Sequence, residues 1–307
     1  MRARGLAAIT AGALIATSLV ASGASGDSGR WGTGSPGPRG GEVHEHAQGG
    51  VSGGASSRAP KAASLLSYHG GPVMAAGAAV TAIYWGTQWT NPTFAGDKTT
   101  GLAAFYSGIG GSSYLNTNTE YTQTGGAFVL NSVTNSPALT DATAAPTSAP
   151  STGAVLNEVA KALQAANQTP VSNGYYPVYS DQKRGKAGYC AWHSNGNIGS
   201  VNVQFAFFFN LDGDSGCNPG STIVGTSQGL AAVANVSAHE LSETMTDPAL
   251  NAWWDSTTGY ENSDKCAWTF SSTPPTFGGR QWKLQGNWSN AAYNANQGYT
   301  RGCIDTR

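Results

Sequence analysis

Charged side chains are scarce in this chain, because Asp, Glu, Lys and Arg together make up 11% of its 307 residues, against about 25% in an average soluble protein. The 16 basic residues nearly balance the 17 acidic ones, so the formal net charge is −1. A protein that binds nucleic acid needs clustered positive charge to neutralise phosphates, so we expect no nucleic-acid partner. A hydrophobic content of 39% excludes wholesale disorder.

Long apolar runs are missing after the N-terminus. No later segment approaches the ~20 consecutive apolar residues that cross a bilayer, so we expect no membrane span in the mature protein. The one apolar run, residues 6–20, follows Arg2 and Arg4 and precedes the small residues 22–24. That order is typical of a secretory signal peptide, and the run is too short and interrupted for a permanent anchor. We predict a signal peptide at residues 1–24 and a secreted, extracellular protein.

Aliphatic side chains are almost absent from residues 25–62, which are mostly Gly, Ser, Pro and Arg. Such a segment cannot bury enough apolar surface to offset its ordering entropy. We therefore predict a disordered leader there, followed by one folded domain over residues 63–307. His44 and His46 form an H-x-H pair inside the leader, but in a flexible segment we expect no metal site from it.

Cysteine is limited to four residues, and none belongs to a CxxC pair, which argues against a cysteine-rich zinc site. Cys190, Cys217, Cys266 and Cys303 permit three disulfide pairings, among which the sequence alone does not decide. We favour Cys190 with Cys217 and Cys266 with Cys303. Each bond would close a loop of moderate length and stabilise the fold by ~3 kcal/mol in the chain-entropy picture.

The hydrophobic pattern predicts a few long elements. Apolar residues at helical spacing predict helices at residues 152–167 and 227–247, the second with Ser227 as its N-cap and Pro248 at its end. A patch rich in Ser, Thr, Ala and Pro predicts a long surface loop at residues 136–152. Apolar runs predict four strands, at residues 78–85, 125–130, 175–179 and 201–211. The fold class that follows is α+β, a single domain with a mixed β-sheet packed against two main helices and stabilised by disulfides.

The candidate chemistry lies on the last predicted helix, in the sequence AHELSE. Positions i and i+4 share a helix face, so His239 and Glu243 can bind one metal ion together. Glu240 follows His239 directly and would project beside the ion, as a catalytic base. This is the arrangement of the H-E-x-x-H metallopeptidase helix, with Glu243 in place of the second histidine.

A downstream acidic pair resembles the remainder of a thermolysin-like (gluzincin) zinc site. In that family a later glutamate completes the zinc site and a nearby aspartate orients a ligand histidine. Glu261 and Asp264 resemble these two residues, although their spacing is one residue shorter. The resemblance implies that Glu261 is a ligand and that Asp264 supports the site.

The donor set leaves the metal and a further ligand open. One imidazole with two carboxylates is a harder set than two histidines, so manganese, iron and calcium stay beside zinc as candidate divalent cofactors. A second imidazole could come from His193, which follows Cys190 closely, or from His69. Asp247 lies one turn beyond Glu243 and can be either a ligand or a helix-ending residue.

Several motifs in order resemble the phosphate-induced protein 1 (EXORDIUM-like) family. They are YHGGPV at residues 68–73, IYWG at 83–86, AHELSETMTDP at 238–248, NAWWD at 251–255 and E-x-x-D-x-C at 261–266. The resemblance covers residues 66–303 and implies a shared fold and an extracellular, wall-associated location. It brings no settled reaction. The candidate site residues fall on positions that match the family pattern: His69, His193, His239, Glu240, Glu243, Glu261 and Asp264.

Two functions from different classes follow. The first is a secreted metal-dependent hydrolase, specifically a zinc-type peptidase with Glu240 as its base. The second is a non-catalytic extracellular or cell-wall-associated binding protein with a structural metal site. Its ligand would be wall polysaccharide or a partner protein. Aromatic rings can stack on sugars, and five tryptophans lie close together in the sequence, although core packing is the plainer explanation for them. They are Trp253, Trp254, Trp268, Trp282 and Trp288.

Overall fold

The structure is a computed structural model that describes residues 64–220 and 223–307, and the backbone of residues 43–46. The signal peptide that we predict at residues 1–24 lies outside the described residues. So does the expected leader, with the exception of residues 43–46, which form a strand.

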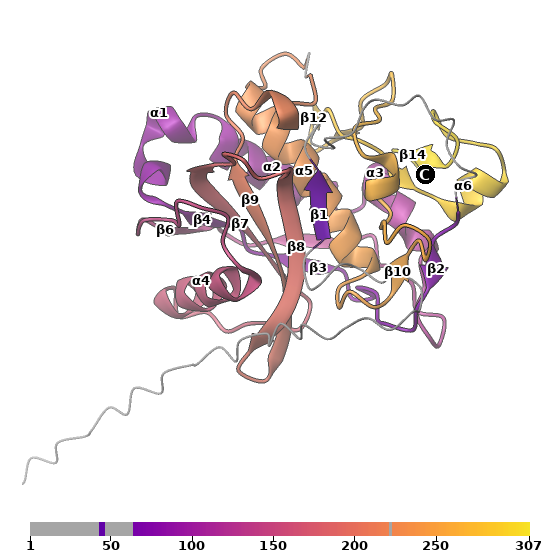
Figure 1. Cartoon of the computed structure of the whole chain (residues 1–307), viewed down its shortest axis with the longest axis horizontal. Helices are drawn as coiled ribbons and strands as arrows, with labels where there is room; N and C mark the ends of the chain where they lie inside the picture. The colour runs from indigo at the N-terminus through magenta and orange to yellow at the C-terminus, as the bar shows by residue number, and fades with distance from the viewer. Residues whose placement is uncertain (1–42, 47–63, 221–222) are drawn as a thin grey trace, which may run out of the picture.

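A mixed eight-stranded sheet organises the fold (Figure 1), in the order β1-β8-β9-β7-β3-β5, with β4 paired to β7 and β6. Strand β7 runs parallel to β9, β3 and β4, whereas β8 runs antiparallel to β9 and to β1. The strands are β1 (Val43–His46), β3 (Ala78–Val80), β4 (Ile83–Trp85), β5 (Val133–Asn135), β6 (Leu139–Asp141), β7 (Gly174–Lys183), β8 (Tyr189–Ile198) and β9 (Val201–Asn210).

Three of the four predicted strands are confirmed. Residues 175–179 lie in β7 and residues 201–210 form β9. The predicted strand at residues 78–85 is divided into β3 and β4, which keep one register against β7. The strand predicted at residues 125–130 is wrong, because Gly125 and Gly126 have φ values of 90° and 82° and turn the chain there.

The loop predicted at residues 136–152 is partly wrong, because it contains β6, which pairs with β4. Two of the longer elements escaped prediction. Helix α2 (Lys98–Ile109) follows the first pair of central strands, and β8 (Tyr189–Ile198) is the neighbour of β9. Strand β8 carries His193, one of the candidate ligands.

Helices cover both faces of the sheet (Figure 1): α4 (Thr152–Ala165) lies on one face, and α2 with α5 (Gln228–Thr246) on the other. On β8, Gly196 lies against Leu156 of α4. Successive strand residues point to opposite faces, so His193 points away from α4 and towards α5. Strand alternation thus places this histidine beside the helix that carries the other candidate ligands.

Helix α5 forms as predicted. Ser227 is its N-cap, and its Oγ accepts the N–H of Leu230 at 3.0 Å. Asp247 is the C-cap, directly before Pro248. Every residue from 229 to 246 is buried, so the polar side chains of this helix lie inside the protein rather than on a solvated face.

The region after α5 is built from short elements joined by turns, and it is cross-linked. Both expected disulfides, Cys190–Cys217 and Cys266–Cys303, are present. None of the helices in the described part of the chain is long and apolar enough to cross a bilayer. The structure is therefore a single α+β domain stabilised by disulfides, as predicted. The remaining elements are β2 (Ser67–Tyr68), η1 (Thr87–Thr90), α1 (Pro92–Ala95), α3 (Ser113–Asn116), η2 (Thr117–Glu120), η3 (Ser215–Cys217), β10 (Trp253–Trp254), η4 (Asp264–Cys266), β11 (Thr276–Phe277), β12 (Arg280–Gln281), β13 (Asn287–Trp288), α6 (Asn290–Asn294) and β14 (Cys303–Ile304).

Candidate metal centre

Helix α5 brings His239 and Glu243 together, one turn apart on one face. Nε2 of His239 lies 3.0 Å from Oε1 of Glu243, and 3.5 Å from Oδ1 of Asp264. The N–H of Asp264 donates to the same Glu243 oxygen at 3.0 Å. We call His239, Glu243 and Asp264 the first trio; they are within reach of one ion.

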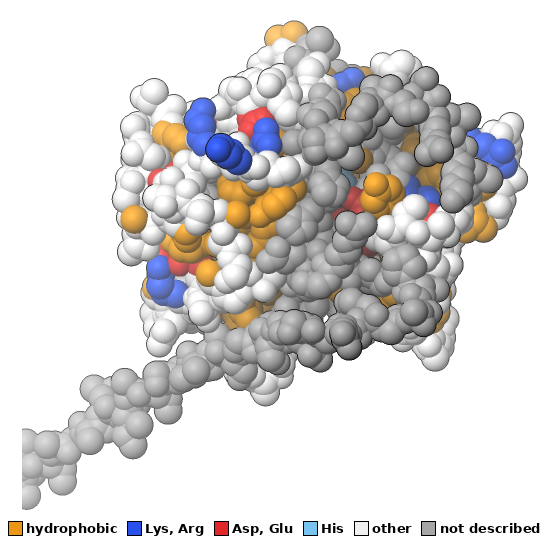
Figure 2. Space-filling view, viewed as in Figure 1, with side chains coloured by type: hydrophobic (Ala, Val, Ile, Leu, Met, Phe, Trp, Pro, Cys, Tyr) orange, Lys and Arg blue, Asp and Glu red, His pale blue; other side chains and the backbone are white. Residues whose placement is uncertain are grey.

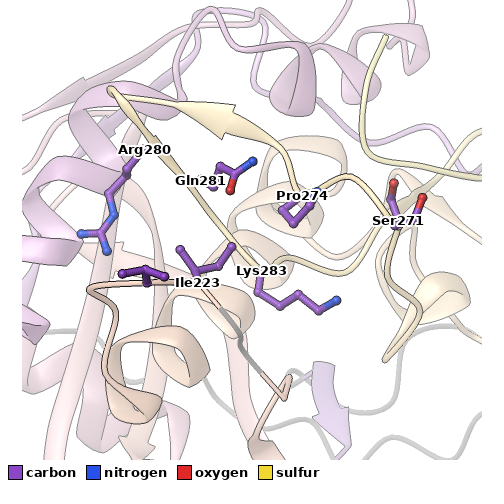
Figure 3. Close-up of a pocket in the computed structure, with 8 residues that line it drawn as sticks. Ile223, Ser271, Pro274, Arg280, Gln281 and Lys283 are labelled. Atoms are coloured by element: carbon purple, nitrogen blue, oxygen red, sulfur yellow. The ribbon is translucent and has the colours of Figure 1, made fainter.

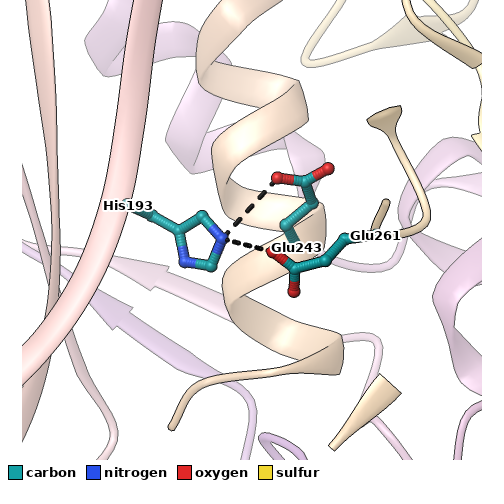
Figure 4. Close-up of side chains that lie close together, drawn as sticks. All are labelled: His193, Glu243 and Glu261. Carbon is teal, nitrogen blue, oxygen red and sulfur yellow. Dashed lines mark hydrogen bonds and ion pairs between the residues drawn. The ribbon is translucent and has the colours of Figure 1, made fainter. Parts of the chain in front are cut away.

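Strand β8 and the loop before η4 supply a second group around the same glutamate (Figure 4). Nε2 of His193 lies 3.0 Å from Oε2 of Glu261 and 3.6 Å from Oε2 of Glu243. All three side chains are buried. We call His193, Glu243 and Glu261 the second trio. Glu243 belongs to both trios, and its two oxygens face different histidines.

The loop that carries Glu261 and Asp264 is held in place by buried polar contacts with η2 and β13. Ser263 Oγ donates to Asn287 Oδ1 at 2.9 Å, and Asn262 Nδ2 donates to Asn118 Oδ1 at 2.9 Å. The disulfide Cys266–Cys303 fixes the end of the loop. These contacts join segments that are far apart in the sequence.

His69, the other histidine that we considered from the sequence, is not part of the cluster. Its Nε2 lies 3.0 Å from Oγ of Ser256, and its ring stacks on Trp254 with centroids 3.4 Å apart. Its side chain is exposed, unlike those of the two clustered histidines. Of the two donors that the sequence offered, the structure brings in His193.

Glu240 is buried on α5 directly beside His239. Burial raises the pKa of the Tyr175 and Tyr106 hydroxyls, and the nearby Glu240 carboxylate adds to both shifts. Its charge also contributes to the raised pKa of Glu261. The catalytic base that we predict is thus close enough to Tyr175 of β7, Tyr106 of α2 and Glu261 for its charge to act on all three.

Asp247 extends the acidic group by one more turn of α5. Its Oδ1 accepts the N–H groups of Asn251 and Ala252, both at 2.6 Å, whereas its Oδ2 has no hydrogen-bond partner among the described residues. Burial raises the pKa of Asp247 to about 7, and hydrogen bonds oppose that rise. Asp247 therefore ends the helix and also contributes a buried carboxylate next to Glu261.

Gln285 is a site residue that the sequence reasoning missed. Its side-chain nitrogen contacts Nδ1 of His239, and its oxygen accepts the N–H of Trp268 at 3.0 Å. The backbone N–H of Gln285 donates to Oδ1 of Asn235 at 2.8 Å, which ties it to α5. Nothing in the spacing of these residues signals the contact, because Gln285 lies 46 positions from His239.

The carboxylates carry buried charge that lysine and arginine do not neutralise. Burial and the charge of Asp264 raise the pKa of Glu243 to about 7, and burial with the charges of Glu243 and Asp247 raises that of Glu261 well above its ordinary value. No lysine or arginine in the described ranges forms an ion pair with Glu243, Asp247 or Glu261. Oε2 of Glu243 and Oε1 of Glu261 have no hydrogen-bond partner there either.

A divalent cation is the simplest partner for this arrangement. A buried carboxylate without hydrogen bonds or a counter-charge is costly. Each trio offers one imidazole nitrogen and two carboxylates, a donor set that suits zinc and also harder ions such as manganese or calcium. The residues present therefore fit a metal ion.

Other surface features do not contribute to this centre. A cavity of about 560 Å³ lies near the N-terminal end of α5, with Ile223, Arg280 and Lys283 in its wall (Figure 3), and none of the candidate ligands lines it. On the face shown in Figure 2, the Lys and Arg side chains of the described residues lie in separate small groups rather than in one stripe.

The clustered tryptophans do not form an open platform. Trp254, Trp282 and Trp288 are buried, and Trp253 packs against Tyr68 with ring centroids 5.4 Å apart.

Comparisons with known proteins find no matching family, no matching curated protein and no matching solved structure for this chain.

Proposed function

We propose that this protein is a secreted metal-dependent hydrolase that cleaves peptide bonds, with zinc as the first candidate metal. One observation carries the proposal: Glu243, Glu261 and Asp247 are fully buried next to two imidazoles, without a lysine or arginine counter-charge among the described residues. Perturbed, buried titratable groups that converge on one point are typical of functional sites.

The chain's own residues have distinct roles in this proposal. His239 and Glu243 hold the cation, with Asp264 or with His193 and Glu261 completing the set. A divalent cation bound there supplies Lewis acidity towards the scissile carbonyl and acidifies water. Glu240 accepts the proton of the attacking water and returns it to the leaving amine. The complete burial of Glu240 limits the access of bulk water.

The edge of the sheet supports a peptide as the substrate. Strand β8 is bordered by β1, the chain's own residues 43–46, and Val43 pairs with His193. An extended polypeptide can therefore form backbone hydrogen bonds along this edge and pass a candidate ligand. A substrate would need the same edge, so we also propose that removal of the leader exposes the site.

The alternative is an extracellular binding protein in which the ion is structural. The burial of His193, His239, Glu243 and Glu261 favours it, because structural ions are enclosed by protein. Membership of the phosphate-induced protein 1 (EXORDIUM-like) family, which we propose from the motifs above, is compatible with both functions. The buried tryptophans give polysaccharide stacking little support.

One pair of variants separates the two functions. Glu240→Gln keeps the size of the side chain but cannot accept a proton, so in a hydrolase it should retain the metal and the melting temperature yet lose about 10²-fold or more in peptide turnover. Glu158→Gln, the same substitution at a buried glutamate of α4, is the matched control. Turnover of casein, with and without chelator, is the measurement. If the wild-type protein binds metal but cleaves no peptide, the hydrolase is excluded and the binding function remains.

A further inference from the structure

We propose that the centre holds two divalent cations, one in each trio, and that the carboxylate of Glu243 bridges them. This inference rests on the proposed function only in requiring that the centre binds a cation. It goes beyond the proposed function because a hydrolase of that kind needs only one ion.

The two oxygens of Glu243 face different partners. Oε1 lies 3.0 Å from Nε2 of His239, whereas Oε2 lies 3.6 Å from Nε2 of His193. A carboxylate that serves one ion presents both oxygens, or one of them, to a single set of donors. Here each oxygen has its own imidazole and its own second carboxylate, Asp264 on one side and Glu261 on the other.

The distances within each trio are close to those between ligands of one ion. Donor atoms at about 2.1 Å from a cation lie about 3.0 to 3.4 Å apart in octahedral or tetrahedral geometry. The separations are 3.0 and 3.5 Å from His239, and 3.0 and 3.6 Å from His193. The donor atoms form two groups, each close enough together to bind one ion, and Glu243 is the residue that the two groups share.

Unpartnered oxygens and the balance of charge give independent support. Oε2 of Glu243, which faces His193, and Oε1 of Glu261, whose other oxygen faces His193, are buried and lack hydrogen-bond partners among the described residues. One ion in the first trio would leave them unsatisfied. When ionised, the five carboxylates of the cluster carry five negative charges, and a single divalent cation balances only two of these charges. The five residues are Glu240, Glu243, Asp247, Glu261 and Asp264.

Two ions would also change what the site can do. In two-metal hydrolytic sites the ions lie about 3.5–4 Å apart and stabilise both the attacking and the leaving oxygen. A bridging carboxylate is suited to hold cations at that spacing. Each trio supplies three protein donors, which leaves coordination positions for water or substrate.

The direct test is metal stoichiometry of the purified full-length protein, by equilibrium dialysis against Zn²⁺ or Mn²⁺ followed by elemental analysis. We expect two ions per chain. His193→Ala and Glu261→Gln should each remove one ion, and His239→Ala should remove the other. Glu158→Gln, remote on α4, should keep both. Circular dichroism on each variant separates loss of an ion from loss of fold.

The bridge has its own spectroscopic signature. Two Mn²⁺ ions that share a carboxylate are exchange-coupled, so the wild-type protein should give a coupled electron paramagnetic resonance spectrum, and Glu261→Gln should give that of an isolated ion. One ion per chain in the wild type would overturn the two-metal centre and leave the proposed hydrolase intact. No bound metal would overturn both. Two ions without coupling would overturn the bridge.

Discussion

Helices α4 and α5 bury glutamates against opposite faces of the same sheet, but they neutralise them differently. Glu158 of α4 is 3% exposed and pairs with Lys161 at 2.8 Å. Lys161 is itself half exposed, and it also pairs with Asp141 of β6. Glu243 of α5 is fully buried and faces two histidines and two more carboxylates.

This difference shows which buried glutamates have a lysine counter-charge and which do not. The long stem of a lysine can reach a buried carboxylate while its ammonium group stays close to water, and α4 uses this solution at the edge of the sheet. The cluster on α5 lies too deep for it, and it concentrates metal-binding donors instead. Glu158 has a lysine counter-charge, although its Oε1 lacks a hydrogen-bond partner among the described residues, whereas Glu243 and Glu261 have neither a lysine nor an arginine beside them there.

The largest expected effect is the response of stability to metal. A ligand present at about 1,000 times its Kd stabilises the native state by about 4 kcal/mol, so wild-type protein should melt at a clearly lower temperature after chelation. Glu243→Ala should abolish this difference, because it removes the residue that both trios share. Differential scanning calorimetry with and without Zn²⁺ measures it.

The α4 cluster provides the control for that experiment. Glu158→Ala should lower the melting temperature by a similar amount with and without metal, because its partner is Lys161 and not an ion. A metal response that survives in Glu243→Ala would place the ion elsewhere and break the contrast between the two helices.

A smaller effect should come from Gln285, which contacts Nδ1 of His239 with its amide nitrogen. A histidine that binds metal through Nε2 carries its proton on Nδ1 and donates it to an acceptor. Gln285→Glu places an oxygen there while another oxygen still accepts the N–H of Trp268. We expect metal affinity to rise by about tenfold, measured by competition with a chromophoric chelator. Unchanged or weaker binding would show that Nε2 of His239 is not a ligand.

The smallest effect is a pH dependence on α4. Burial and the hydrogen bond with Asp141 raise the pKa of Glu158 from 4.5 to about 7. The native state then binds more protons than the unfolded state between these values, so stability from this group falls as pH rises through that window. Asp141 has its pKa lowered, and its contribution is lost only in more acidic solution.

Glu158→Gln should remove this dependence. The difference in unfolding free energy between the variant and the wild type should shift in favour of the variant between about pH 4.5 and about pH 7. We expect a shift of about 1 kcal/mol, well below the ~1.4 kcal/mol per pKa unit of an unscreened group, because the Lys161 partner is half exposed to solvent. Urea titrations at several pH values measure it. A difference that stays constant with pH would show that Lys161 keeps Glu158 ionised throughout.

The helix-borne part of the site was predictable because its geometry is local. His239 and Glu243 share a face by helical spacing alone, and the N-cap at Ser227 and the stop at Pro248 are sequence signals. His193 could be proposed but not placed, because its position depends on the pairing of β8 with β9. The contact of Gln285 with His239 is set by turns between distant segments, which no spacing reveals.

In the fold, too, local features were predictable from the sequence and contacts between distant segments were not. Helix α2 escaped prediction although Leu102, Phe105, Tyr106 and Ile109 are buried at helical spacing, because its glycines weaken helix propensity. One of them, Gly101, is required by the packing, since a Cβ there would meet the side chain of Leu230. At this position glycine lowers the helix propensity but allows α2 and α5 to pack closely. The sequence pattern does not show that contact.

The positions of the disulfides bear on the stage of folding at which the proposed centre could bind metal. Cys190 precedes His193 by three residues on β8, and Cys266 follows Asp264 by two, so each bond anchors a segment that bears a candidate ligand. Before oxidation these segments are not cross-linked, and we expect a nascent, reduced chain to compete poorly for intracellular zinc. Metal loading should therefore follow disulfide formation, which would match the protein to the metals of the compartment where its cysteines are oxidised.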